Sequence, residues 1–284
     1  MSLSPLTPPP ARILKAGRHS LVLGPRTLVM GVLNVTPDSF SDGGLSAAPE
    51  AALANARAMI AEGADILDVG GESTRPGHTP LSADAEWARI APVLAGLAAL
   101  DDVPPVSVDT WKADVARRAL AAGATIVNDI WGFARDPDMA RAAADFDAAA
   151  IVMHNRETLD PAIDIVADMI AFFERARETA AAAGLAEDRL VLDPGIGFGK
   201  TPEQNLTALR RLGELRVLGL PILLGTSRKS FIGRIYPSTP TERLPGTLAS
   251  HALGILSGVE IVRAHDVAAH VQAARVLDAI RAAP

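Results

Sequence analysis

The chain has 284 residues, 49% of them hydrophobic and 21% charged, so it can bury a sizeable core and is not disordered as a whole. Its formal net charge of −6 argues against the broad basic surface that a nucleic-acid partner requires. The sequence has no cysteine, which excludes disulfides, thiolate metal sites and cysteine nucleophiles and suits a reducing cytoplasm.

The first residues differ in composition from the rest. Residues 1–11 are rich in Ser, Thr and Pro and lack the basic-then-apolar layout of a signal peptide, so we expect a flexible tail. Residues 13–24 could form a small hairpin. Later apolar stretches, such as residues 90–100, are too short and too regularly helical to cross a membrane. We expect a soluble protein with one folded domain over residues 12–284.

From residue 28 onward, short apolar segments alternate with helical ones. The predicted strands are 28–34, 66–70, 105–109, 126–129, 149–153, 190–193, 221–225 and 261–263. The predicted helices are 49–62, 82–100, 112–122, 136–144, 161–183, 201–212, 244–257 and 266–281. Eight repeats of strand and helix predict a single-domain α/β protein, a (β/α)8 TIM barrel with a short hairpin-like extension at its amino terminus. An open doubly wound sheet is the alternative fold.

Polar residues stand where the predicted strands end. In chain order they are Asn34, Asp68, Asp109, Asn128 with Asp129, His154, Asp193, Ser227 with Arg228 and Lys229, and Arg263 with His265. The strand starts carry no such series. Because the carboxyl ends of barrel strands converge on one mouth, we expect a ligand site there.

Two loops after the first two strands favour an anion. Residues 34–44 form a long, small and polar loop whose backbone amides could fold over a negative group. Residues 70–77 place Arg75 between small residues and Pro76, and an arginine pairs well with a phosphate or carboxylate. Taken alone, the first loop could equally be an ordinary surface loop, and the second would favour a solvated arginine in a turn.

Three strand ends favour recognition of a heterocycle. A carboxylate such as Asp109 or Asp193 accepts two hydrogen bonds from adjacent N–H and NH2 groups, as an aminopyrimidinone ring presents them. A lone aspartate here is more often a helix cap. Together with Asn128, the set favours a ligand.

Two glycine-containing loops complete the pattern. Residues 193–200 read DPGIGFGK, in which the glycines permit close approach of the backbone and Phe198 could stack on an aromatic ring. The spacing does not match nucleotide-binding fingerprints. Residues 225–233 should begin a helix near Ser230, where backbone amides and Lys229 favour an anion.

The order and spacing of four segments closely resemble the dihydropteroate synthase family. They are residues 31–44 (GVLNVTPDSFSDGG), 66–77 (ILDVGGESTRPG), 193–200 (DPGIGFGK) and 227–230 (SRKS). The resemblance implies that the pyrophosphate of 6-hydroxymethyl-7,8-dihydropterin is replaced by p-aminobenzoate, with Mg²⁺ assisting, to give 7,8-dihydropteroate for folate biosynthesis. It also implies a cytoplasmic homodimer, for which the apolar stripe of Val267, Val271, Ala274 and Leu277 on the last helix could supply an interface.

The same resemblance implies roles for individual residues. The pterin would contact Asp109, Asn128, Met153, Asp193, Lys229 and Arg263. The p-aminobenzoate site would comprise Thr74, Arg75, Pro76, Phe198, Lys229 and Ser230. The pyrophosphate would contact Asn34, Arg75, Arg263 and His265, with Asn34 also meeting the metal. Catalysis would rest on Asn34, Asp109, Lys229 and Arg263.

One segment departs from the family pattern. After the fifth strand many members carry a Met-His-X-Gln/Arg-Gly-like sequence, whereas residues 153–157 here read MHNRE. Asn155 and Arg156 therefore receive no role. Two other functions stay open: a pterin-binding methyltransferase domain that serves a corrinoid protein, and a non-catalytic paralogue that binds a pterin without turnover.

Overall fold

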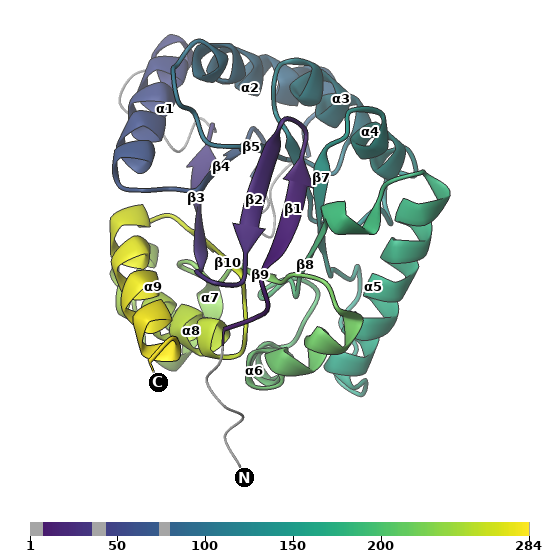
Figure 1. The fold of residues 1–284 in the computed structure, drawn as a ribbon, viewed down its shortest axis with the longest axis vertical. Helices are drawn as coiled ribbons and strands as arrows, with labels where there is room; N and C mark the ends of the chain where they lie inside the picture. The colour runs from purple at the N-terminus through teal and green to yellow at the C-terminus, as the bar shows by residue number, and fades with distance from the viewer. Residues whose placement is uncertain (1–7, 36–43, 74–79, 284) are drawn as a thin grey trace.

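The described part of the chain forms a closed barrel of parallel strands surrounded by helices (Figure 1). The computed structural model describes residues 8–35, 44–73 and 80–283. Within these residues the main sheet has eight strands in the order β8-β7-β6-β5-β4-β3-β10-β9. A parallel bridge between Leu192 and Ile222 joins the two outer strands. The predicted TIM barrel is therefore confirmed, and the open sheet is excluded.

The strands lie close to the predicted positions. They are β3 (Leu28–Asn34), β4 (Ile66–Gly70), β5 (Val106–Asp109), β6 (Ile126–Asp129), β7 (Ala149–Met153), β8 (Leu190–Asp193), β9 (Leu223–Leu224) and β10 (Ile261–Ala264). Strand β9 is shorter than predicted because Pro221 has no N–H and the Ile222 N–H donates to the Glu260 carboxylate (2.8 Å). A side chain thus replaces part of the ladder.

The helices also follow the predicted order. They are α1 (Gly44–Ala61), α2 (Ala83–Ala98), α3 (Ala113–Ala121), α4 (Met139–Asp145), α5 (Ile165–Ala182), α6 (Pro202–Arg210), α7 (Ser230–Ile235), α8 (Leu244–Leu256) and α9 (Val267–Arg281), with short 3-10 turns η2 (Glu187–Arg189), η3 (Leu212–Leu218) and η4 (Pro240–Arg243). Capping sets several starts: Asp164 accepts from the amides of Val166 and Ala167, so α5 begins at Ile165 and not at Pro161. None of the described helices is long and apolar enough to cross a membrane.

A two-stranded hairpin closes the amino-terminal end of the barrel. Strands β1 (Arg12–Ala16) and β2 (His19–Leu23) pair antiparallel and lie across the ring of strands in Figure 1. Leu14, Ala16 and Leu23 are buried in one cluster with side chains from the barrel interior. Because this burial removes the apolar interior from water, the hairpin acts as a plug. The hairpin expected near residues 13–24 is confirmed.

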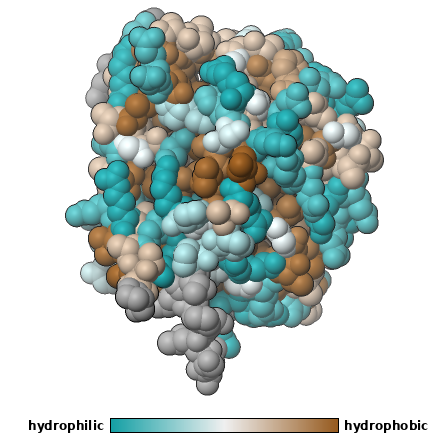
Figure 2. Space-filling model, viewed as in Figure 1, coloured by the Kyte–Doolittle hydropathy of each residue, from teal (hydrophilic) through white to brown (hydrophobic). Residues whose placement is uncertain are grey.

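The outer surface of the plug is partly apolar. The face viewed in Figure 2 is largely hydrophilic, with an apolar patch near its centre where the hairpin lies. Ile13 and Val22, which pair across the hairpin, are each 55% exposed. Residues 1–7 of the predicted tail lie outside the described residues, while Pro9 is buried. The division into a flexible tail and a domain from residue 12 stays a prediction.

The apolar stripe of α9 faces the barrel. Val267, Val271 and Ala274 are buried in the core between helices and strands, and Leu277 packs against it. The expectation that this stripe supplies a subunit interface is therefore wrong, since its side chains are already used in the fold.

Candidate active site

Strand register brings the predicted polar residues to one level at the mouth of the barrel. Asn34 is paired with Gly70, Gly70 with Asp109, and Asp109 with Asn128, across four neighbouring strands. On the other side, Met153 is paired with Asp193. A Cβ placed on Gly70 would lie 3.7 Å from both Asn34 Oδ1 and Asp109 Oδ2. The predicted level of strand-end groups is thus present for Asn34, Asp109, Asn128 and Asp193. Two other predicted members lie elsewhere: Asp129 accepts from the amides of the loop that follows it, and His154 is buried against Phe172.

Two buried carboxylates hold Arg263 at this mouth. Its Nε donates to Asp68 Oδ2 (2.6 Å) and its Nη2 to Asp109 Oδ2 (2.7 Å). Asp68 Oδ2 also accepts from Asn128 Nδ2 (3.0 Å). The sequence places Asp68 at a strand end but indicates no role for it, because no spacing pairs it with residues 60 and 195 positions away. The network fixes the planes of both the guanidinium and the amide.

Asp109 combines a partner with a free atom. Its Oδ1 is buried and has no hydrogen-bond partner among the described residues. Burial raises the pKa of Asp109 to about 7, against the attraction of Arg263 and with a contribution from nearby Asp68. A ligand that donates an N–H here would satisfy the unpartnered oxygen.

Lys229 lies on the opposite side of the mouth, against the glycine-rich loop. Its Nζ is 3.9 Å from the centroid of the Phe198 ring, and burial lowers the pKa of Lys229 to about 8. Asp193 accepts from the Gly195 amide (2.8 Å), and its pKa is raised by burial. Predicted residues of the pterin and p-aminobenzoate groups therefore meet at Lys229.

The segment after β9 is tied to the segment after β10. Ser227 Oγ lies 2.9 Å from His265 Nδ1 and accepts from the His265 amide (3.2 Å). Arg228 has a positive φ of 58° and forms a two-bond ion pair with Asp266, at 2.6 and 3.1 Å. Burial lowers the pKa of His265 to about 3, so its imidazole is neutral. Ser230 begins helix α7, as predicted.

The predicted p-aminobenzoate residues Thr74, Arg75 and Pro76 lie outside the described residues. The segments that flank them are anchored by a buried lysine. Lys112 Nζ donates to the carboxylates of Glu72 and Glu86, at 2.5 Å in both cases. Glu72 also accepts from the Leu81 amide (3.1 Å). The sequence did not predict this anchor, because Lys112 lies 40 and 26 positions from its two carboxylates.

The side chains around Asn34 offer few ligands for a divalent cation. In the described ranges no three His, Cys, Asp or Glu side chains are grouped to hold a metal ion. Mg²⁺, however, keeps several waters and binds through one or two protein oxygens together with substrate phosphates. The half-buried Asn34, whose Oδ1 lies beside Gly70 at the mouth, fits that limited requirement.

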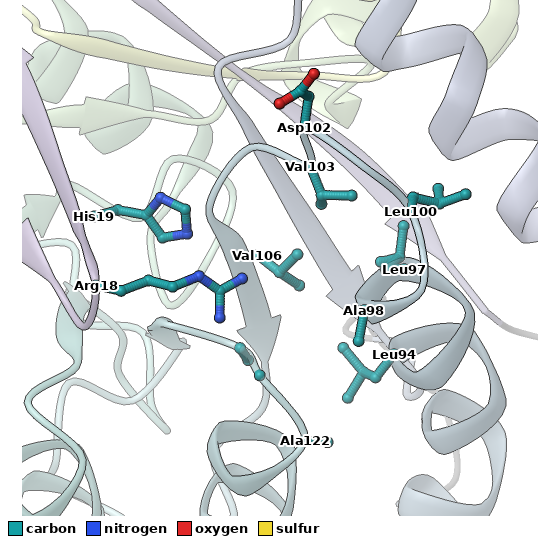
Figure 3. Close-up of a pocket in the computed structure, with 12 residues that line it drawn as sticks. Arg18, His19, Leu94, Leu97, Ala98, Leu100, Asp102, Val103, Val106 and Ala122 are labelled. Carbon is teal, nitrogen blue, oxygen red and sulfur yellow. The ribbon is translucent and has the colours of Figure 1, made fainter.

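A groove of about 370 Å³ lies at the opposite end of the barrel (Figure 3). Arg18 and His19 of the hairpin turn face Leu94 and Leu97 of α2 across it. Its lining is otherwise mostly apolar and comes from the end of α2 and the segments that lead into β5 and β6, at the end of the barrel that seldom carries chemistry. The mouth is therefore the candidate active site.

Comparisons with known proteins identify the family of this chain. Residues 30–265 match the model of a family described as pterin binding enzyme. A dihydropteroate synthase of Clostridium beijerinckii is 44% identical over 94% of this chain and 99% of its own length. Among solved structures, a dihydropteroate synthase of Clostridium difficile in the presence of pteroic acid is 49% identical. Its TM-score is 0.87 over 93% of this chain and 98% of that one. Another, of Xanthomonas albilineans with 4-aminobenzoic acid, is 41% identical, with a TM-score of 0.91 over 97% of this chain and 100% of that one.

Proposed function

Since the chain belongs to the dihydropteroate synthases within the pterin-binding enzyme family, we propose that the mouth of its barrel performs the reaction of that family with the residues described above. The enzyme is a transferase that joins 6-hydroxymethyl-7,8-dihydropterin pyrophosphate to p-aminobenzoate, giving 7,8-dihydropteroate and pyrophosphate. The corrinoid methyltransferase alternative is set aside, because relatives that cover nearly the whole chain are dihydropteroate synthases.

The observation that carries this assignment of the site is the Oδ1 of Asp109, which has no partner in the part of the chain that the structure describes and lies beside the Asp68–Arg263 network. A pterin would donate its ring N–H and amino hydrogens to carboxylates such as Asp109 and Asp193, with Asn128 alongside. Met153 and Lys229 would complete the pocket, and Arg263 would stack over the ring.

The second substrate would lie on the Lys229 side. Phe198 and Lys229 form one wall, and Ser230 at the start of α7 would meet the p-aminobenzoate carboxylate. Thr74, Arg75 and Pro76 are proposed to complete this site on the strength of the sequence motif alone. This arrangement would hold the amine facing the pterin methylene.

The leaving group would lie over the neighbouring ends of β3 and β10. We assign pyrophosphate contacts to Asn34, Arg75, Arg263 and His265. Asn34 would hold Mg²⁺, which supplies neutralisation of the pyrophosphate charge when bound. His265, neutral and bonded to Ser227, could donate Nε2–H to a phosphate oxygen if its proton is on that nitrogen.

The chemistry requires no side-chain nucleophile. The amine attacks the exocyclic methylene, the bond to the pyrophosphate oxygen breaks, and the amine then loses a proton. Arg263 would stabilise the charge that develops on the leaving oxygen, in a position fixed beforehand by Asp68 and Asp109. Catalysis would thus rest on orientation and electrostatics, with Asn34, Asp109, Lys229 and Arg263 as its main residues.

The direct test incubates purified protein with dihydropterin pyrophosphate, p-aminobenzoate and Mg²⁺. Dihydropteroate and pyrophosphate should form only when both substrates are present, and turnover should be lost in Asp109→Asn and in Lys229→Ala. Pterin binding without product in the unaltered protein would revive the non-catalytic alternative.

We also propose a cytoplasmic homodimer. The outer faces of α8 and α9, which pack together, expose Leu253, Leu256, Val276 and Ile280 at 39–55%. An apolar face of this kind suits a twofold interface. Val276→Asp should shift the sedimentation coefficient to that of a monomer, whereas Val217→Asp, at an exposed valine of η3, should not.

A further inference from the structure

The glycine-rich loop between β8 and α6 lies directly on the segment that departs from the family pattern. Gly195 and Gly199 have positive φ angles of 64° and 54°. A Cβ on Gly195 would overlap the His154 carbonyl oxygen, and one on Gly199 would lie 2.5 Å from the Arg156 nitrogen. The two backbones are therefore in contact with no room for side chains between them.

A buried ammonium closes this loop from below. Lys200 is only 7% exposed, and its Nζ donates to the carbonyl oxygens of Gly195 (2.9 Å) and Phe198 (3.1 Å). A third bond runs to His154 Nδ1 (2.7 Å). One compact group thus holds both ends of a four-residue turn, which the planar fork of an arginine could not do in the same geometry.

The imidazole beneath Lys200 is itself held in place. Because His154 accepts at Nδ1, its hydrogen lies on Nε2, which donates to Asp168 Oδ2 (2.9 Å). Arg156 donates to the same Asp168 oxygen (2.8 Å), and the ring packs edge-on against Phe172. Burial lowers the pKa of His154 to about 3, which agrees with a neutral imidazole as acceptor. Burial also lowers the pKa of Lys200, to about 7, and its Nζ donates in either protonation state.

Phe198 is the point at which this network reaches the candidate active site. Its carbonyl is bonded to Lys200, and its ring lies against the Lys229 ammonium at 3.9 Å. Gly197, next to it, also lies against Lys229. A shift of the loop backbone would therefore move the aromatic wall relative to Lys229.

We propose that Lys200 and His154 are positioning residues that fix Phe198 for the second substrate, without touching either substrate. This inference rests on the proposed function, in which Phe198 and Lys229 bind p-aminobenzoate. It gives residues 154–156 a role: they support the glycine-rich loop, with Arg156 acting through Asp168.

The test compares steady-state constants of the full-length protein and its variants. Lys200→Met should raise the KM for p-aminobenzoate about tenfold, with less than about threefold change in the KM for the pterin pyrophosphate. Asp168→Asn, a near-isosteric change, should move the same constant in the same direction by a smaller factor. Lys15→Met, at an exposed lysine of the hairpin, should leave both constants unchanged.

A double variant distinguishes positioning from general support of the fold. If Lys200 acts through Phe198, adding Lys200→Met to Phe198→Ala should change the KM for p-aminobenzoate less than about twofold. Independent, multiplying effects, or equal changes in both KM values, would overturn the proposal. Should Lys200→Met fail to fold, Asp168→Asn with and without Phe198→Ala decides in the same way. Absence of turnover in the unaltered protein would instead contradict the proposed function.

Discussion

Asp68 and Arg263 form a buried ion pair at the mouth of the barrel, with Arg263 Nε 2.6 Å from Asp68 Oδ2 and Asp68 fully buried. The same carboxylate oxygen accepts from Asn128. Two residues proposed to bind the pterin are thus oriented by a third that the ligand need not touch. Asp68 should therefore affect activity through Arg263 and Asn128, and this effect can be measured apart from its contribution to the fold.

Asp68→Asn should lower kcat/KM for the pterin pyrophosphate by about tenfold to a hundredfold. The change removes the charge that holds Arg263 while keeping side-chain shape, and misplaced groups of this kind cost about this much. Steady-state kinetics with the pterin varied would measure it. Asp65→Asn, which alters a carboxylate paired with Arg26 at the other end of β4, is the matched control and should keep its rate constants. Equal losses in both variants would contradict a specific role.

Pterin affinity should fall as the pH falls through about 7. Asp109 has a pKa raised from 3.8 to about 7 by burial, so the empty site holds a proton below that pH. A pterin that donates to the carboxylate must displace this proton, and the Kd should rise by about tenfold per pH unit below 7. Burial also raises the pKa of Asp193, which weakens pterin binding at low pH in the same way. Calorimetry in buffers of different ionisation enthalpy would detect the released proton; a constant Kd from pH 8 to 5.5 would refute the shift.

Lys112→Met should destabilise the protein by about 3–5 kcal/mol, because it takes the cation away from the buried Glu86 carboxylate and removes one partner of Glu72. Lys112 is 8% exposed and bonds both Glu72 and Glu86. Denaturant unfolding would measure the loss. The triple variant with Glu72→Gln and Glu86→Gln removes both negative charges that face Lys112 and should recover much of the stability. A triple variant as unstable as Lys112→Met would show that lost packing, and not charge, is responsible.

Gly195→Ala should be far more damaging than Gly184→Ala. Both glycines have positive φ, 64° and 81°, so each substitution carries a backbone strain of about 1–2 kcal/mol. At Gly195 the added Cβ would also overlap the His154 carbonyl, whereas at Gly184 nothing lies within 4 Å. Thermal unfolding of the two variants isolates the steric part. Similar melting temperatures for the two variants would mean that the glycine-rich loop is not in such close contact with His154.

The succession of elements was predictable because its signals are local. Apolar strands and helical segments follow one another in the chain, and a cap such as Asp164 lies within a few residues of the amides it binds. The errors arise where a tertiary contact overrides a local signal. Strand β9 is short because Glu260, 38 positions from Ile222, takes the place of a ladder bond. The stripe on α9 has the same pattern whether it faces a barrel or a second subunit.

The sequence by itself determined the barrel, the polar mouth and the glycine loops, because each depends on periodicity or on residue types at fixed spacing. Only the tertiary structure decided which strand-end groups pair. Asp68 reaches Arg263 across 195 positions and Lys200 reaches His154 across 46. Strand register and contact between loops determine these pairs, and neither produces a recognisable spacing of residues in the sequence. The residues that support the site are therefore visible only in the closed barrel.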